Sequence, residues 1–271
     1  MSLDNISLKD IAVSLQYLKI KQMKIGIIGT GAIGGTIARK LVGAGHQVKV
    51  ANTKGVEGVK DFAREIAAEP QDIRGVIKDV EIIVLSIPFA SIAELPKDLF
   101  CSVSDDVVIV DSNNYYPGRK HGVIQEIEDG MVESLWVSEQ IGRSVIKAFN
   151  MLLAHTLING GKPQNDKRRL GMLVAGDNVI KKEKVMRLVE DMGFDAIDNG
   201  LLKDSWSQQP NSPGYCCDYT AEMLKDIRCK STATKESVFQ NRKRFDAEFA
   251  LLANDDFSHE NVIRINRDFN K

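Results

Sequence analysis

Three glycines near the start of the chain have the spacing of a phosphate-binding loop. Gly29, Gly31 and Gly34 form the pattern G-x-G-x-x-G between an apolar run at 23–28 and a helical run at about 32–42. A strand before the pattern and a helix after it make the pattern specific. The first glycine allows a tight turn, the second lets backbone approach a pyrophosphate, and the third lets the helix pack closely. Free N–H groups and the helix dipole would bind the diphosphate, so we expect a dinucleotide site. The alternative is a simple strand–helix turn.

The residues after the next predicted strand, 47–51, indicate which dinucleotide binds. Asn52, Thr53 and Lys54 follow that strand, and no acid precedes Glu57. A site for NAD places a carboxylate there for the ribose 2′-hydroxyl. Hydrogen-bond donors and a positive charge suit the 2′-phosphate of NADP instead. One hydrogen bond to a charged group contributes about 1.5–3 kcal/mol, which corresponds to about a 10- to 100-fold preference for NADP over NAD. We therefore expect NADP, the alternative being that Lys54 is a solvated loop charge.

Polar residues also follow three later predicted strands. These strands are expected over 81–87, 106–111 and 144–149. In a doubly wound sheet a ligand binds at the carboxyl ends of the strands, where Ser, Asn and Tyr suit a nicotinamide amide and ribose. Asp111 could instead cap a turn, and Tyr115 and Tyr116 could be packing residues. The predicted cofactor-binding residues are Gly29, Thr30, Gly31, Ala32, Ile33, Gly34, Asn52, Thr53, Lys54, Ser86, Ile87, Pro88, Asn113 and Ala148.

Residues for proton transfer are not evident. His46 lies in a tight turn, His121 and His259 are expected to be exposed, and His155 is the one candidate acid. No metal-binding spacing is present, and the four cysteines fit reduced packing residues. We therefore assign no catalytic residue. Hydride transfer between two bound cofactors needs positioning more than proton transfer, whereas carbonyl or imine reduction normally needs a general acid.

The order of the elements predicts an α/β fold with a doubly wound (Rossmann), mostly parallel sheet and a short helical C-terminal extension. We expect an N-terminal helix within 1–22, an NADP-binding domain over 23–200 with one continuous sheet, and an extension over 201–271 that caps the sheet. The further predicted strands are 170–175 and 194–198, with a short one hidden within 70–78; the further helices are 56–67, 133–141, 151–158, 178–192, 219–228 and 235–252.

Composition limits the partners. Net charge is -1, 43% of the residues are hydrophobic and 27% are charged. This balance argues against nucleic acid, and no apolar run reaches the roughly 20 residues of a membrane span. We expect a cytoplasmic protein whose partner is a small-molecule hydride acceptor or donor. The N-terminal helix packs on its own domain or on a second subunit, and we expect a homodimer.

Further motifs resemble a known family. They are Val-Ile-Lys-Ala-Phe-Asn at 145–150, Val-Ala-Gly-Asp at 174–177, Asn-Tyr-Tyr-Pro at 114–117 and the Ser-Trp segment at 205–215. With the glycine loop, these resemble the NADP oxidoreductases dependent on coenzyme F420, a deazaflavin, over about residues 23–220. The cytosolic domain of six-helix membrane metalloreductases is similar too.

The resemblance implies NADP binding by residues 30–34, by Asn52–Lys54, and by Ile87 and Ala148, with direct hydride transfer to a deazaflavin. Thr53 and Lys54 stand where the family often has arginine, and the long segment 206–215 replaces a simpler loop. A flavin could therefore replace the deazaflavin, and Trp206 could stack on the acceptor or be a core residue. The alternatives are an NADPH-dependent reductase of a small substrate and a non-catalytic NADPH sensor.

Overall fold

Parallel apolar strands form the centre of the molecule. The computed structural model describes residues 22–117, 122–250 and 258–269. Within these residues the main sheet has six strands in the order β3-β2-β1-β4-β5-β6, all paired in parallel. They are β1 (Lys24–Ile28), β2 (Gln47–Ala51), β3 (Glu69–Pro70), β4 (Ile82–Leu85), β5 (Val108–Asp111) and β6 (Ile146–Lys147). This is the strand order of a Rossmann sheet, which confirms the predicted fold class.

Helices cover both faces of this sheet. Ile82 and Val84 of β4 belong to one hydrophobic cluster, while Ile83 and Leu85 belong to a second, because successive strand residues point to opposite faces. Helices α2 (Ala32–Gly43), α3 (Gly55–Ile66), α6 (Ala154–Asn159) and α7 (Val179–Asp191) contribute to the first cluster. The second cluster receives the 3-10 helix η1 (Phe89–Ile92), α4 (Gln125–Glu128) and α5 (Glu133–Ile141).

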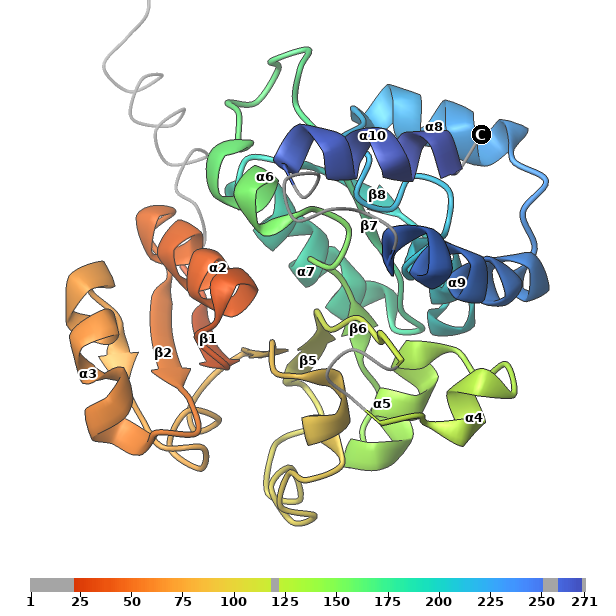
Figure 1. Cartoon of the computed structure of the whole chain (residues 1–271). Helices are drawn as coiled ribbons and strands as arrows, with labels where there is room; N and C mark the ends of the chain where they lie inside the picture. Colours follow the sequence, from red (N-terminus) through yellow and green to blue (C-terminus); the bar gives the residue numbers. More distant parts are fainter. Residues whose placement is uncertain (1–21, 118–121, 251–257, 270–271) are drawn as a thin grey trace, which may run out of the picture.

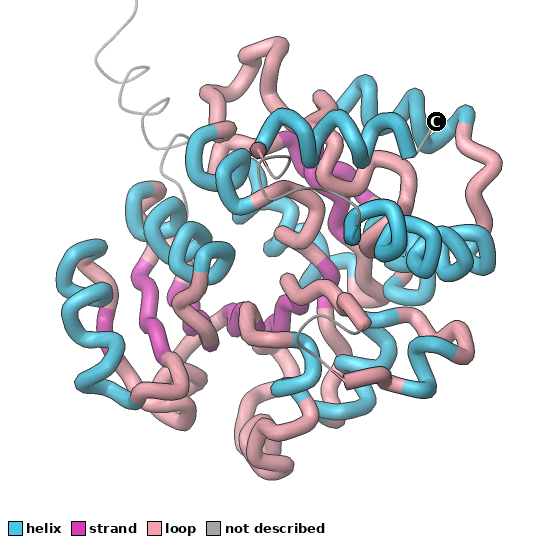
Figure 2. The backbone as a smooth tube through the Cα atoms, viewed as in Figure 1, coloured by secondary structure: helices cyan, strands magenta, loops and turns pink. Residues whose placement is uncertain are grey.

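The predicted continuous sheet is wrong. Strands β7 (Gly171–Val174) and β8 (Asp195–Asp198) form a separate parallel pair, joined to the main sheet by one antiparallel bridge between Lys147 and Ala175. Figure 2 shows this pair apart from the main sheet. The Gln208 side chain lies between the two sheets: its amide nitrogen lies 3.2 Å from the Leu173 carbonyl oxygen and 3.4 Å from that of Lys147, which also accepts from the N–H of Ala175. A side chain, rather than a further strand, thus bonds to the Leu173 carbonyl oxygen at this place.

Helical elements follow the second sheet. They are the 3-10 helix η2 (Leu202–Gln208), α8 (Ala221–Lys230), α9 (Lys235–Ala250) and α10 (His259–Phe269). The predicted helices at α8 and α9 are confirmed, whereas η2 and α10 were not predicted. Helix α8 contacts β7 and β8 (Figure 1), and η2 contacts α5 and β6. The domain boundary at residue 200 stays a prediction, and the N-terminal helix lies outside the described residues, except Gln22.

Candidate cofactor site

The glycine loop connects β1 to α2 with the geometry that its pattern predicts. Gly29 has φ +104°, and a Cβ on it would lie 2.0 Å from the carbonyl oxygen of Ser86. A Cβ on Gly34 would lie 2.1 Å from the Gly29 carbonyl oxygen, so α2 packs directly against the loop. At both positions a side chain would collide with backbone, and glycine is therefore required.

Gly31 differs from the other two glycines. It is exposed, and a Cβ on it would meet nothing within 4 Å. The open space lies at the N-terminus of α2, where Gly31 is the N-cap, no side chain caps the helix and no acid occupies the first turn. Unpaired N–H groups at such a terminus favour an anion. The residues present therefore fit a dinucleotide pyrophosphate beside Thr30, Ala32 and Ile33.

The turn after β2 lies beside this loop. The Asn52 amide nitrogen donates to the Thr30 hydroxyl at 2.9 Å, and the backbone N–H of Lys54 donates to the Asn52 side-chain oxygen at 2.9 Å. Thr53 and Lys54 are exposed. Glu57 is the first acid, and its carboxylate faces Lys60 at 3.2 Å. No acid therefore lies between the end of β2 and Glu57 in this turn.

Loops after β4 and β5 meet at the same edge of the sheet. The N–H of Ile87 donates to the Asn113 side-chain oxygen at 3.0 Å, and the Asn113 amide donates to Asp111 at 3.0 Å. Asn113 is buried, so its side chain holds the Ser86–Pro88 loop in place. Ala148 is fully buried too, and its N–H donates to the Asp111 carbonyl oxygen at 3.2 Å. The predicted residues after β4, β5 and β6 thus lie at the carboxyl ends of adjacent strands.

A buried ion pair under these loops was not predicted. The Lys147 ammonium lies 3.0 Å from the Asp111 carboxylate, and both side chains are fully buried. Ser134 also donates to this carboxylate at 2.7 Å. Asp111 also accepts from the N–H of Asn113, which agrees with the alternative that it caps the following turn. Tyr115 is fully buried with its hydroxyl accepting from the N–H of Ile124, which makes it a packing residue.

The segment 205–215 packs on the same edge of the sheet. Asn150 donates to the side chain of Asn114 at 3.0 Å and to the carbonyl oxygen of Gln208 at 2.6 Å. The Tyr116 and Tyr215 hydroxyls share a hydrogen bond. The sequence predicted that this segment lies near the carboxyl ends of the strands. The Trp206 side chain is half-buried and lines a cavity together with Arg228. A core position for Trp206 is therefore wrong, and its stacking on an acceptor stays a prediction.

The histidines lie outside this arrangement. His155 is exposed, its ring centroid lies 4.3 Å from that of His259, and none of its described contacts is with a predicted cofactor residue. His259 is half-buried rather than exposed, with Nε2 at 3.2 Å from the Thr156 hydroxyl. His46 is buried, and His121 lies outside the described residues. Among the described residues no group of His, Cys, Asp and Glu is arranged to hold a metal ion.

No helix in the described part of the chain has the length and apolarity needed to cross a bilayer. The cytoplasmic location and the homodimer stay predictions.

Solved structures support the fold. A hypothetical protein from Sinorhizobium meliloti superposes with a TM-score of 0.61 and 24% identity, covering 74% of this chain and 97% of that one. A protein from Arthrobacter sp. FB24 described as an F420-dependent NADP reductase gives a TM-score of 0.56 and 20% identity, covering 77% of this chain and 92% of its own. At such identities the likeness establishes the architecture.

Sequence comparisons establish the family. The model of the family "NADP oxidoreductase coenzyme F420-dependent" matches residues 24–115, which contain the glycine loop and the loops after β2 and β4. YjhV of Escherichia coli (strain K12) is 35% identical over 108 residues, which are 40% of this chain and 77% of that protein. The metalloreductase STEAP3 of Rattus norvegicus is 25% identical over 195 residues, which are 70% of this chain and 36% of that protein. The chain therefore belongs to the family of NADP oxidoreductases dependent on coenzyme F420.

Proposed function

We propose that the protein transfers a hydride between NADP(H) and a deazaflavin or flavin-type acceptor. The observation that carries this proposal is the glycine loop, in which Gly29 and Gly34 are closed by backbone while Gly31 leaves open space at the N-terminus of α2. The acid-free turn at Asn52–Lys54 lies beside it. Membership in the family supports NADP as the cofactor.

Three groups of residues would hold the cofactor. The backbone of Thr30–Gly34 would bind the pyrophosphate, and Asn52, Thr53 and Lys54 would bind the 2′-phosphate. The nicotinamide half would lie against the loop Ser86–Pro88, with Asn113 and Ala148 fixing the loops behind it. The nicotinamide ring supplies the hydride when the cofactor is bound.

The ionisable groups near this edge are already committed to one another. Asp111 and Lys147 form a buried pair, and Glu133 accepts from the Arg242 guanidinium at 3.1 Å. Burial raises the pKa of Glu133, with Arg242 opposing that rise. In our proposal these groups position loops rather than transfer protons. Hydride exchange with a second ring system needs such positioning more than a general acid, because solvent can supply the proton that the reduced ring takes up.

A second candidate is the reduction of a small imine or carbonyl substrate. The hydrogen-bonded hydroxyls of Tyr116 and Tyr215 favour it, because phenols at the edge of the sheet could donate to a substrate. Burial raises the pKa of Tyr215 well above its usual value, so this hydroxyl stays protonated at neutral pH. A protonated phenol is a hydrogen-bond donor, although a weak acid.

Stopped-flow mixing separates these functions. Protein loaded with NADPH is mixed with coenzyme F420, FMN, or a panel of imines and ketones, and NADPH absorbance is followed. We expect oxidation by the deazaflavin or flavin and not by the imines and ketones. The opposite pattern would support the reductase, and no oxidation by any acceptor would support a non-catalytic NADPH sensor.

A matched pair of glycine variants links this activity to the proposed site. Gly31→Val should abolish NADPH binding and turnover, because its side chain would fill the open space, while circular dichroism stays near that of the wild type. Gly43→Val is the control, since a Cβ there also meets nothing within 4 Å but lies at the other end of α2. Retained binding in Gly31→Val would mean that the cofactor lies elsewhere.

A further inference from the structure

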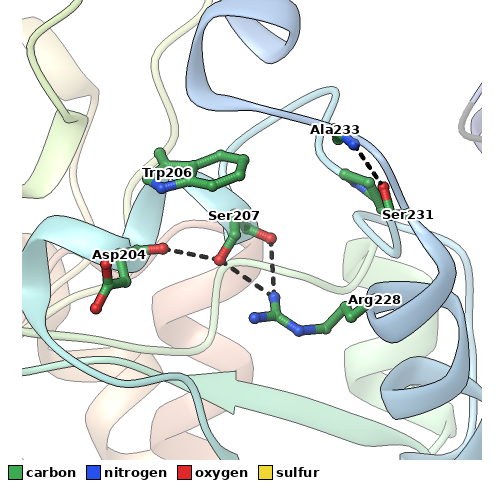
Figure 3. A pocket seen from close by; sticks show the side chains of 7 residues that line it. Asp204, Trp206, Ser207, Arg228, Ser231 and Ala233 are labelled. Atoms are coloured by element: carbon green, nitrogen blue, oxygen red, sulfur yellow. Dashed lines mark hydrogen bonds between the residues drawn. The ribbon is translucent and has the colours of Figure 1, made fainter.

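A cavity of about 250 Å³ lies beside η2 and shares no lining residue with the predicted cofactor site. Trp206 and Ser207 of η2 line it, together with Pro213 from the following loop, Arg228 of α8 and Ser231 at the end of α8. Figure 3 shows Ser207 between Trp206 and Arg228, with its hydroxyl and carbonyl oxygens toward the guanidinium. Three segments that are separate in sequence therefore enclose one small space.

Arg228 in this cavity lacks an acidic partner. The guanidinium donates to the Ser207 carbonyl oxygen at 3.3 Å, to the Ser207 hydroxyl at 3.2 Å, and to the Asn199 side-chain oxygen. All three acceptors are neutral, and no carboxylate of the described residues forms an ion pair with it.

Two buried arginines elsewhere in the described residues are paired with acids. Arg169 lies between the carboxylates of Glu190 and Asp195, and Arg242 lies between those of Glu128 and Glu133. Arg228 is half-buried without such compensation, and burial lowers its pKa. Because a desolvated cation is costly unless it is paired, this position favours an external anion.

The walls of the cavity limit the kind of anion. One guanidinium offers a single positive charge, and Asp204 also lines the cavity, so a monoanion suits it better than a phosphate dianion. A carboxylate matches the planar fork of arginine. The half-buried indole of Trp206 offers a flat apolar surface, on which an aromatic ring can stack. The volume suits a molecule with one ring.

We propose that this cavity binds a small aromatic carboxylate, whose ring packs on Trp206 and whose carboxylate pairs with Arg228. The cavity shares no lining residue with the predicted dinucleotide site, and this inference does not depend on the proposed function.

Indole N–H signals in nuclear magnetic resonance test this proposal directly. The chain has two tryptophans, and the second, Trp136, is 5% exposed and stacks on Phe89 at 5.1 Å, so it serves as an internal control. A Trp206→Phe variant assigns the two signals. Benzoate should shift the Trp206 signal saturably and leave that of Trp136 unchanged. Benzamide has the ring without the charge, and inorganic phosphate has charge without the ring, so each should bind at least about ten-fold more weakly.

Arginine variants test the ionic contact. Arg228→Gln should weaken benzoate binding at least ten-fold, whereas Arg187→Gln, which changes an exposed arginine of α7, should not. Unchanged benzoate affinity in a folded Arg228→Gln protein would overturn the proposal. Should that variant fail to fold, the wild type still decides: equal affinities for benzoate and benzamide, or no shift of the Trp206 signal with benzoate, would overturn it.

Discussion

At the scale of single residues, we propose that the choice between NADP and NAD depends on Lys54. It is exposed at the start of α3, and no acid lies between it and the end of β2. We expect NADPH to bind about 10- to 100-fold more tightly than NADH, from one charged hydrogen bond. Lys54→Asp should erase or reverse this preference, as measured by calorimetry.

Lys60→Asp is the control for that experiment. Lys60 lies on the same helix and pairs with Glu57, so its replacement changes the charge equally without touching the turn after β2. It should retain most of the preference for NADPH. Equal affinities of the wild type for NADPH and NADH would contradict our assignment.

His46 makes stability depend on pH. Its Nδ1 accepts from the N–H of Met23 at 3.2 Å, and Nε2 lies 3.2 Å from the Asp191 carboxylate. Burial lowers its pKa despite this carboxylate. The unfolded chain, with a pKa of about 6.5, therefore binds the proton more readily than the folded one, and stability falls as pH drops below about 6.5.

Urea unfolding between pH 7.5 and 5.5 measures this effect. The midpoint of the wild type should fall more steeply towards acid than that of His46→Gln, in which the titrating group is absent. His155→Gln, which changes an exposed histidine, should behave like the wild type. Identical pH profiles for the wild type and His46→Gln would refute the assignment.

At the scale of secondary-structure elements, the Gln208 side chain joins the main sheet to the pair β7–β8. Its amide nitrogen contacts the carbonyl oxygens of Lys147 and Leu173 and the side chain of Asn150, and its oxygen accepts from Asn199. Gln208 is fully buried, so Gln208→Leu removes these hydrogen bonds and leaves their partner groups unpaired away from water. Each buried polar group left unpaired costs about 1–3 kcal/mol. We expect a loss of about 2–4 kcal/mol in the free energy of unfolding by denaturant titration.

Substitution of an exposed glutamine, Gln125, serves as the control for the loss of stability in Gln208→Leu. Gln125 lies at the start of α4 and bonds to Asp129, so Gln125→Leu should change stability by less than about 0.5 kcal/mol. A Gln208→Leu protein as stable as the wild type would show that the side chain does not hold the sheets together.

Elements with local signals could be predicted from the sequence. The strand at 47–51 and the helix at 133–141 have the predicted bounds, because apolar period and glycine punctuation are local. The strand–loop–helix geometry around the three glycines could be predicted for the same reason. The break between β6 and β7 was not predictable in this way, since the side chain that lies between the two sheets, Gln208, is 61 residues from Lys147.

Buried charges escaped prediction for a different reason. Lys147, Glu133 and Arg242 are residue types that normally lie on the surface, and their pairing joins distant parts of the chain. His155, the candidate acid, lies against His259 because α10, which was not predicted, carries that partner.

At the scale of the whole molecule, Arg242 of α9 connects the C-terminal helices to α5, which packs on the main sheet. Its guanidinium lies 3.1 Å from the Glu133 carboxylate and 5.0 Å from the centre of the Tyr115 ring. Arg242→Met leaves Glu133 buried without its partner, and breaking a buried pair in this way costs about 3–5 kcal/mol. We expect that loss in denaturant unfolding, and partial recovery in the double variant Arg242→Met, Glu133→Met.

Arg264→Met serves as the control, because it also replaces an arginine of the C-terminal helices. Arg264 is exposed on α10 and lies 3.6 Å from Asp268, so its loss should change stability by less than about 1 kcal/mol. Additive losses in the double variant would show that Arg242 and Glu133 do not act as a pair.

Direct hydride transfer is the central claim, and deuterium transfer tests it. NADPH deuterated in turn at each C4 position is mixed with the protein and oxidised coenzyme F420, and the reduced deazaflavin is examined by mass spectrometry. We predict that one of the two labelled forms gives its deuterium to the deazaflavin ring and slows NADPH oxidation. Deazaflavin reduced without deuterium from either form, or NADPH left unoxidised by both deazaflavin and flavin, would contradict the account.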